Sequence, residues 1–550
     1  MNHIIGIDLG TTNSTLAFSP KEQADIQQFE IVQLIDKNME GKKALLPSFF
    51  FFPLEEQEGP CVGWYARERG GELPDRVIAS AKSWLCHDMI DRRSAFLPLG
   101  ECEKKRSPLD VCAAFLNHLR TGWERTFPSL PFHEQSLLIT VPASFDPGAR
   151  SLVLEASQLA GFSEVRLIEE PLAAFYSWLY NHRENWRSHL KVGDTVLVID
   201  IGGGTTDFSL ISVEDSGGDL TLERKAVGDH LLLGGDNIDL ALAYYMQQKF
   251  SKTLDEWQFQ SLIYECRRAK ETLLGDSPPK EMEIMLQGRG SSLIGGSLSA
   301  ILSREEVENT LVEGFFPYVD LQESSFQEKR SGLAKVGLPY ARDARITAQL
   351  ARFLSQANAP LPAAVLFNGG TMKAVAFQQR ILSLLEQWKK SEVRNLEGAD
   401  LDFGVCRGAV YYGWALANKS IRVKAATCRS YYIGVEGSAP AIPGIPSPLK
   451  KIRLVPFGME EGSEVTLENE RFSLFLDEPA FFRFFSQSSP ASDEMTELHP
   501  IETILHAHGE EGKVVLVKLT AKVTELGVLE LWCIAEDGRK WKLEFDIRNK

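Results

Sequence analysis

The apolar residues follow two different patterns along the chain. Up to about residue 416, short apolar runs typical of strands are followed by longer segments whose apolar residues recur three and four positions apart, as on one face of a helix. The clearest strands are expected at 136–141, 165–168, 197–201, 208–213 and 364–367, and the clearest helices at 146–160, 236–250, 255–274 and 374–388. Asp146 is expected to cap the first of these helices, with Pro147 at its first position. Strands and helices that alternate on this scale predict an α/β architecture with layered sheets.

The pattern changes after about residue 420. Strand-length segments separated by Gly and Pro turns follow at 451–456, 471–475, 480–485, 513–519 and 528–534, and they predict a separate all-β domain. We therefore expect a first domain over residues 1–417, a linker over 418–430 and a β-sandwich-like domain over 431–550. The aromatic run 481–485 has two interpretations, a groove for an extended peptide or an ordinary sandwich core.

Composition narrows the function classes. The 550 residues carry 59 Lys and Arg against 75 Asp and Glu, and this net charge of −16 argues against a nucleic-acid binder and favours a soluble monomer. The eight cysteines include no Cys-x-x-Cys pair, so neither a zinc site nor a disulfide framework is expected. The N-terminus has no signal-peptide pattern, and prolines interrupt the apolar stretch 44–54. We therefore expect a cytoplasmic protein without membrane contact.

An aspartate at the end of an apolar strand, followed by a Gly/Thr turn and a second strand, occurs twice. The first copy spans residues 5–16 around Asp8, and the second spans 198–209 around Asp200. A repeat at such long range predicts two related lobes. Glycine turns allow backbone N–H groups to converge on phosphate oxygens, and each aspartate can hold a hydrated Mg²⁺ or K⁺ that bridges to them. Two facing hairpins would therefore bind a polyphosphate from both sides, with two ordinary tight turns as the alternative.

A third glycine pair, Gly369 and Gly370, lies between the expected strand 364–367 and the expected helix 374–388. Such a junction presents free backbone N–H groups and the positive end of a helix dipole. Its position late in the second lobe favours a nucleoside contact, and an ordinary strand-to-helix turn is the alternative.

These motifs together resemble those of the actin-like ATPase superfamily, and within it the seventy-kilodalton heat-shock (DnaK-type) chaperone family. The matching segments, in the family's order, are 6–14, 139–143, 169–174, 200–207, 233–236, 268–270, 368–370 and 407–409. The sequence looks like a divergent bacterial DnaK-related member. The resemblance implies a two-lobed actin-like ATPase domain followed by an all-β C-terminal domain. Because the sequence ends at Lys550, the family's helical lid is not expected.

The resemblance also implies a ligand, ATP or ADP, with Mg²⁺ and with K⁺ as a further candidate ion. It places the following residues at the nucleotide: Gly10, Thr11, Thr12, Asn13, Gly202, Gly203, Gly204, Thr205, Gly234, Gly235, Asp236, Lys270, Gly369, Gly370, Thr371, Lys373 and Asp402. Asp8 and Asp200 would orient Mg²⁺ through water. The catalytic group would be Lys82, Glu170, Asp200, Thr205 and Asp207.

Several of these assignments have structural alternatives. Lys82 would be the γ-phosphate lysine, or else a solvated helix lysine. Glu170 would position water or Mg²⁺, or else be a structural carboxylate. Pro142 and Arg150 match the family's pair that relays the nucleotide state to the other domain, while an ordinary helix-face cation is the alternative for Arg150.

The sequence departs from the family pattern on the adenine side and in the linker. Glu271 stands where the family often has an arginine that stacks on adenine, and Leu274 replaces a serine hydroxyl. A lost stack and a lost hydrogen bond predict weaker ATP binding. After Gly370 the family's Ser-Thr-Arg becomes Thr-Met-Lys. The expected linker is basic over 419–424, where the family has acidic residues and consecutive leucines, so the usual linker docking is not expected.

Three functions follow from these observations. The first is a slow Mg-dependent ATPase with chaperone-like binding of a polypeptide client, served by a cochaperone or an exchange factor. The second is a nucleotide-dependent binding or scaffold module with weak or no ATPase activity and one dedicated protein partner. A sugar-type kinase of the same superfamily is less favoured, because it would have no use for the C-terminal β-domain.

Overall fold

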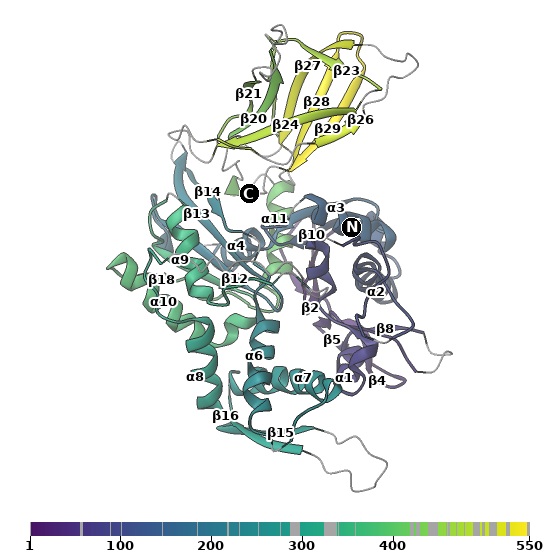
Figure 1. The fold of residues 1–550 in the computed structure, drawn as a ribbon, viewed down its shortest axis with the longest axis vertical. Helices are drawn as coiled ribbons and strands as arrows, with labels where there is room; N and C mark the ends of the chain where they lie inside the picture. The colour runs from purple at the N-terminus through teal and green to yellow at the C-terminus, as the bar shows by residue number, and fades with distance from the viewer. Residues whose placement is uncertain are drawn as a thin grey trace, which may run out of the picture. The chain divides into compact units, whose positions relative to one another are not determined.

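The structure is a computed structural model, whose fold is shown in Figure 1. It describes residues 2–54, 59–87, 90–100, 102–145, 147–183, 185–216, 219–229, 231–250, 252–275, 277–286, 298–323, 338, 340–357, 359–418, 423–424, 430–437, 449–457, 459, 463–468, 470–477, 479–487, 495–497, 501–504, 514–523 and 528–546. The chain forms two compact units, Met1–Leu220 with Val227–Arg422 and Thr221–Ala226 with Val423–Lys550. The domain boundaries predicted from the sequence stay a prediction, and most of the expected linker lies outside the described residues.

Two sheets with the same local topology form the centre of the first unit. In spatial order, the first sheet contains β11 (Val165–Glu169), β10 (Ser136–Val141), β1 (His3–Leu9), β2 (Asn13–Pro20) and β3 (Gln27–Gln28), and β6 (Leu46–Pro47) also pairs with β2. The second contains β18 (Arg394–Asn395), β17 (Ala364–Asn368), β12 (Thr195–Ile201), β13 (Thr206–Ser216) and β14 (Asp219–Val227). In each sheet a central strand, β1 or β12, forms an antiparallel hairpin with the next strand and a parallel pair with β10 or β17. The sequence repeat is therefore also a repeat of topology.

Two helices connect these sheets. Helix α11 (Gly404–Ala417) packs on β1, β2 and β10, whereas α4 (Glu170–Asn181) packs on β12, β13 and β17, and the two helices lie against each other (Figure 1). Gly408 allows the close approach, because a Cβ there would lie 1.7 Å from the carbonyl oxygen of Ala173. The α4–α11 contact therefore determines how near the two sheets can come.

The rest of the first unit surrounds this centre. Its helices are α1 (Trp64–Glu72), α2 (Pro108–Thr126), α3 (Pro147–Leu159), α5 (Trp186–His189), α6 (Gly235–Gln247), α7 (Glu256–Leu273), α8 (Arg304–Phe315), α9 (Ile346–Gln356) and α10 (Val375–Lys389), with 3₁₀ turns η1 (Pro74–Arg76), η2 (Ala81–Cys86), η3 (Phe132–Glu134) and η4 (Gly370–Lys373). Its smaller sheets are made of β4 (Ile31–Asp36), β5 (Met39–Lys43), β7 (Phe50–Phe51), β8 (Cys61–Val62), β9 (Val77–Ile78), β15 (Glu281–Leu286) and β16 (Leu298–Ser303).

The second unit is largely β-stranded. One sheet contains β21 (Leu449–Val455), β20 (Ser430–Glu436), β24 (Pro479–Gln487), β25 (Thr496–Glu497) and β26 (Ile501–Ile504), and the other contains β22 (Glu464–Thr466), β23 (Phe472–Phe475), β27 (Val514–Val523), β28 (Val528–Ala535) and β29 (Lys540–Asp546). Residues 221–226 of β14 also belong to this unit and include a parallel pair with β19 (Val423–Lys424). Of the aromatic run, Phe484 is in the core between the sheets and Phe485 is buried, whereas Phe481 is 64% exposed. The run is therefore mainly sandwich core.

The predicted mixed α/β region and the largely β-stranded C-terminal region are confirmed. The expected helix 255–274, for example, is α7, which begins with a capping box: the Asp255 carboxylate accepts from the Gln258 N–H while the Gln258 side chain accepts from the Asp255 N–H. Asp146, the expected cap of α3, lies outside the described residues. The seven described cysteines form no disulfide. Within the described residues, no helix is long and apolar enough to cross a bilayer.

Candidate functional site

The two repeated aspartates occupy equivalent positions in the two sheets. Asp8 lies opposite Thr140 of the parallel strand β10, and the Thr140 hydroxyl donates to its carboxylate at 2.9 Å. Asp200 lies opposite Asn368 of the parallel strand β17, and the Asn368 amide donates to its carboxylate at 2.7 Å. In each sheet the strand paired in parallel therefore orients the aspartate. Sequence reasoning did not assign this role to Thr140 or Asn368.

Lys82 is a buried ion-pair partner, not a solvated lysine. It lies in η2 with 4% of its side chain exposed, and its Nζ is 2.5 Å from Oε1 of Glu170, the first residue of α4. Burial alone would lower the pKa of Lys82, but attraction to Glu170 and to Asp8 outweighs it and raises the pKa. The lysine is therefore held as a cation at the start of α4.

Three further carboxylates lie around this pair: Asp200 and Asp207 are buried, and Asp8 is half-buried. Burial and repulsion from Glu170 raise the pKa of Asp8 to about 6. Burial, followed by repulsion from Glu170 and Asp207, raises the pKa of Asp200 well above its ordinary value. Burial also raises the pKa of Asp207 to about 7, against a hydrogen bond from Ser144. Carboxylates that repel one another in a low-dielectric site favour a bound cation.

The sequence predicts that Asp8 and Asp200 contact Mg²⁺ through water, and such a contact needs fewer protein ligands than direct metal ligation does. Within the described part of the chain, no three His, Cys, Asp or Glu side chains gather closely enough to ligate a metal directly. A hydrated Mg²⁺ keeps several waters and needs only one or two carboxylates. The residues present therefore fit a hydrated ion.

The turns of the two hairpins lie against each other and leave no room for larger side chains. A Cβ on Gly203 would lie 1.7 Å from Oγ1 of Thr12, and one on Gly204 would lie 2.6 Å from Oγ of Ser83 and 2.8 Å from Cγ2 of Thr11. In the first hairpin, a Cβ on Gly10 would lie 2.1 Å from the carbonyl oxygen of Asn13. A larger residue at any of these positions would therefore displace its neighbours, and at Gly10 the neighbour is backbone.

Several donors at this contact have no acceptor. Among the described residues, nothing accepts a hydrogen bond from the backbone N–H groups of Gly203 and Gly204. The buried hydroxyl of Ser83 likewise has no partner within the described chain. Thr205 is also buried, directly after these glycines. Orphaned donors at a glycine turn fit an anion such as phosphate, which is the observation that connects this site to a nucleotide.

The start of α6 supports the second hairpin through its own backbone. The N–H of Gly235 donates to the Gly202 carbonyl at 3.0 Å, and the N–H of Asp236 donates to the Gly203 carbonyl at 2.7 Å. The N–H of Gly234 donates to the Asn237 side chain. Gly234, Gly235 and Asp236 are predicted at the nucleotide, and the structure shows that their N–H groups donate within the protein and position the turn.

A network of half-buried charges around the buried Asp239 lies beside this helix start. Arg267 contacts the carboxylates of Asp236 at 2.5 Å and Asp239 at 2.7 Å, and Lys270 contacts Asp239 at 2.6 Å. The Ser80 hydroxyl also donates to Asp236 at 2.6 Å. Asp239, which is 1% exposed, was missed by sequence reasoning, although it lies on α6 one helical turn after Asp236. Its contact positions Lys270.

The expected adenine side carries ion pairs. Glu271 of α7 pairs with Arg67 of α1 at 2.9 Å, and Lys373 pairs with Asp402 at 2.6 Å. The Thr371 hydroxyl donates to the Gly202 carbonyl at 3.0 Å.

The glycine pair beside these residues differs in its local geometry. Gly369 has φ +87 and its Cβ would lie 2.3 Å from the Ile201 carbonyl oxygen, so only glycine fits there. Gly370 begins η4 and has open space around it. Like Thr371, Gly369 therefore lies next to the second hairpin.

Arg150 is buried, so the helix-face alternative is wrong. Its guanidinium donates to the carbonyls of Phe145 and Ala143 and pairs with Glu169 at 3.0 Å, with 2% of the side chain exposed. It thus ties the segment that begins at Pro142 to the end of β11. A relay role for Pro142 and Arg150 stays a prediction.

Comparison with known proteins identifies the class. Residues 4–320, more than half of the chain, match the Hsp70 protein family, so this chain belongs to the Hsp70 family, as the motifs predicted. Its relatives include proteins named "Chaperone protein HscA homolog" from Rickettsia prowazekii, 30% identical over 277 residues, and from Rickettsia bellii, 31% identical over 273 residues. These matches cover 50% and 49% of this chain, and 42% and 41% of the respective relatives. The chain thus spans less than half the length of these curated relatives.

Proposed function

We propose that the first unit is a two-lobed actin-like ATPase that binds Mg·ATP between its two hairpins and hydrolyses it slowly. The observation that carries the proposal is the set of orphaned donors, Gly203 N–H, Gly204 N–H and Ser83 Oγ, beside a cluster of buried carboxylates. Membership of the Hsp70 family, whose members are ATPases, supports it. K⁺ is a second candidate for the cation position.

The residues around the two hairpins offer what phosphoryl transfer to water requires. Phosphoryl transfer depends on positioning and charge neutralisation more than on a covalent group. The orphaned N–H groups and the hydroxyls of Thr12 and Thr205 would hold the phosphates. Lys82, held by Glu170, would neutralise the γ-phosphate, and Asp207 with Ser144 would orient the attacking water. When bound, Mg²⁺ would add positive charge on the phosphates, with Asp8 and Asp200 orienting it through water.

Turnover of Mg·ATP tests the ATPase. Thr205→Ala and Lys82→Ala should each lower the rate by roughly a hundredfold, the usual effect of removing one positioned donor. Lys280→Ala, which changes an exposed lysine, serves as the matched control and should leave the rate unchanged. Circular dichroism checks that each variant is folded. Equal rates in all four proteins would refute the catalytic assignment.

We also propose that the second unit binds polypeptide and that the two activities are coupled. Family membership supports this proposal, and so do exposed apolar side chains on this unit, among them Phe481 at 64% and Leu516 at 58%. Coupling is reciprocal, so a bound peptide should change nucleotide affinity or turnover. The ATPase rate is measured with and without unfolded model peptides. A rate that responds to none of them would refute the chaperone half and leave the ATPase standing.

A nucleotide-dependent binding module with little turnover and one dedicated protein partner is the second candidate. The ion pair between Arg67 and Glu271 favours this candidate, because Glu271 stands at the expected adenine-stacking position and is paired with Arg67. Calorimetry with Mg·ATP beside the turnover assay separates the two candidates. Binding without turnover would support the module, whereas binding with turnover that depends on Lys82 would support the ATPase.

A further inference from the structure

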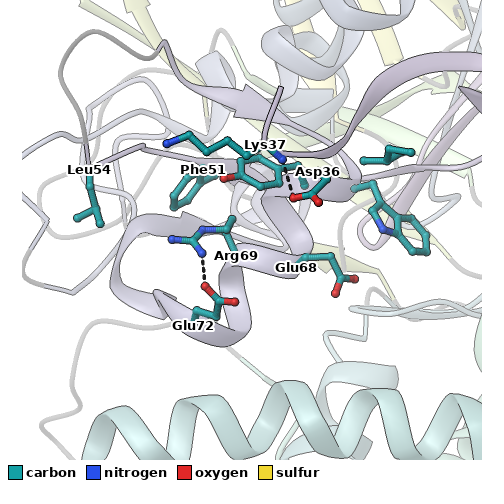
Figure 2. A pocket seen from close by; sticks show the side chains of 10 residues that line it. Asp36, Lys37, Phe51, Leu54, Glu68, Arg69 and Glu72 are labelled. Atoms are coloured by element: carbon teal, nitrogen blue, oxygen red, sulfur yellow. Dashed lines mark hydrogen bonds and ion pairs between the residues drawn. The ribbon is translucent and has the colours of Figure 1, made fainter. Parts of the chain in front are cut away.

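A cavity in the first unit is lined by residues that the proposed function does not use. It has a volume of about 560 Å³ and lies between the β4–β5 hairpin, β7 and α1 (Figure 2). None of the residues expected at the nucleotide lines it. We call it the α1 pocket.

Aromatic rings and an exposed leucine form the apolar part of the α1 pocket. Phe51 is buried, and its ring and the Tyr65 ring form a T-shaped pair at a centroid distance of 6.2 Å. The Arg69 guanidinium lies 5.8 Å from the centroid of the Phe51 ring. Leu54 at the rim is 60% exposed. The pocket therefore offers apolar surface that solvent reaches.

The lining carries an excess of negative charge. Its carboxylates are Asp36, Glu68 and Glu72, and its cations are Lys37 and Arg69. Arg69 is hydrogen-bonded to Glu72, so these two charges neutralise each other. Within the described residues, the carboxylate of Glu68 has no ion-pair partner, and Figure 2 shows it directed away from the Arg69–Glu72 pair. The pocket is thus suited to a cation.

We propose that the α1 pocket binds a polypeptide partner that presents an arginine or lysine next to an apolar residue. The cation would pair with Glu68, while its aliphatic stem would lie along the half-buried ring of Tyr65, as basic side chains commonly do on apolar and aromatic surfaces. The neighbouring apolar residue would cover Leu54. Met39, which is 56% exposed, lies opposite the lining residue Asp36 in the β4–β5 hairpin and offers a second apolar side chain beside the pocket.

A polypeptide accounts for the surface better than a small free cation does. A small cation would satisfy Glu68 but would leave the exposed side chains of Leu54 and Met39 in water. Apolar side chains next to a charged rim are typical of protein interaction sites. The proposal is independent of ATP binding, because it uses no residue that is proposed to bind the nucleotide.

Fluorescence anisotropy with the full chain and three labelled peptides tests the proposal. The peptides have the sequence Ala-Leu-X-Leu-Ala, with X as arginine, its neutral isostere citrulline, or glutamate. The citrulline peptide should bind about fivefold more weakly, the effect of losing one partly exposed ion pair. The glutamate peptide should bind more weakly still. Equal affinity for the arginine and citrulline peptides would overturn the proposal, as would no binding of any peptide at about 1 mM.

Protein variants and crosslinking locate the binding. Glu68→Gln should weaken the arginine peptide about fivefold, and Glu68→Lys should weaken it further, because repulsion replaces attraction. Glu103→Lys reverses a charge on another exposed, unpaired glutamate and is the matched control. An arginine peptide carrying benzoylphenylalanine should crosslink to Leu54 or Met39. Unchanged affinity in Glu68→Lys, or crosslinks confined to residues 430–546, would overturn the proposal.

Discussion

The ion pair between Lys82 and Glu170 makes a sharp prediction about stability. The two side chains are 4% and 12% exposed, and their charged atoms are 2.5 Å apart. Lys82→Met removes the cation but keeps most of the side-chain volume. Glu170 then remains buried and unpaired near Asp8, Asp200 and Asp207, whose charges already repel it. We therefore expect the first unit to lose stability through an uncompensated buried charge.

The magnitude follows from burial. Breaking a buried pair by removing one partner typically costs about 3–5 kcal/mol, because the other charge stays without compensation. We expect the upper part of this range, since the neighbouring carboxylates add repulsion instead of relief. Replacing both partners by apolar residues of similar volume is often close to neutral. The double variant Lys82→Met, Glu170→Leu should therefore recover most of the loss.

Urea unfolding without nucleotide or Mg²⁺ measures this effect. Circular dichroism and tryptophan fluorescence are followed together, because two compact units can unfold in separate transitions. Lys280→Met, at an exposed lysine, is the control and should change the free energy of unfolding by less than about 0.5 kcal/mol. A loss that small in Lys82→Met would refute the reasoning. A double variant less stable than Lys82→Met would also refute it.

Three further predictions concern helix packing, ATP affinity and pH. Gly408→Ala should destabilise the first unit by about 3 kcal/mol in the same urea assay, because its Cβ would lie 1.7 Å from the Ala173 carbonyl oxygen. The control Gly71→Ala, in open space on α1, should not destabilise the first unit. Calorimetric titration should give a dissociation constant for Mg·ATP above about 1 μM, because Glu271, which is paired with Arg67, stands where an arginine would stack on the base. A sub-micromolar dissociation constant would contradict this. Burial lowers the pKa of His118 in the folded protein, so as the pH falls the unfolded chain takes up this proton at a higher pH than the folded one does. The free energy of unfolding should therefore decrease as the pH drops through about 6.5. His118→Gln should remove that part of the loss between pH 8 and pH 5.5, and an identical loss in both proteins would count against the assignment.

Local patterns predicted most of the elements. The periodicities that placed a strand at 136–141 and helices at 255–274 and 374–388 depend on neighbouring residues, and the structure has β10, α7 and α10 there within two residues. The two aspartate–glycine motifs could be recognised for the same reason, since each lies within a dozen consecutive residues. The Hsp70 assignment followed from these motifs and is confirmed.

The partners of the site residues could not be predicted in the same way. Thr140 reaches Asp8 from 132 positions away, and Asn368 reaches Asp200 from 168 positions away. Glu271 reaches Arg67 across 204 positions. Such contacts arise from parallel strand register and helix packing, which no local periodicity encodes.

The sequence alone therefore determined the class of protein and the alternation of strands and helices. It also determined which charged and hydroxyl-bearing residues lie in or next to the two Gly/Thr turns along the chain. Only the tertiary structure decided that Lys82 and Arg150 are buried in ion pairs and that the N–H groups of Gly235 and Asp236 are already used. It also decided that the N–H groups of Gly203 and Gly204 have no acceptor among the described residues. The physical reason is that burial and hydrogen-bond satisfaction depend on atoms brought together from distant parts of the chain, whereas residue type and spacing are properties of the sequence itself.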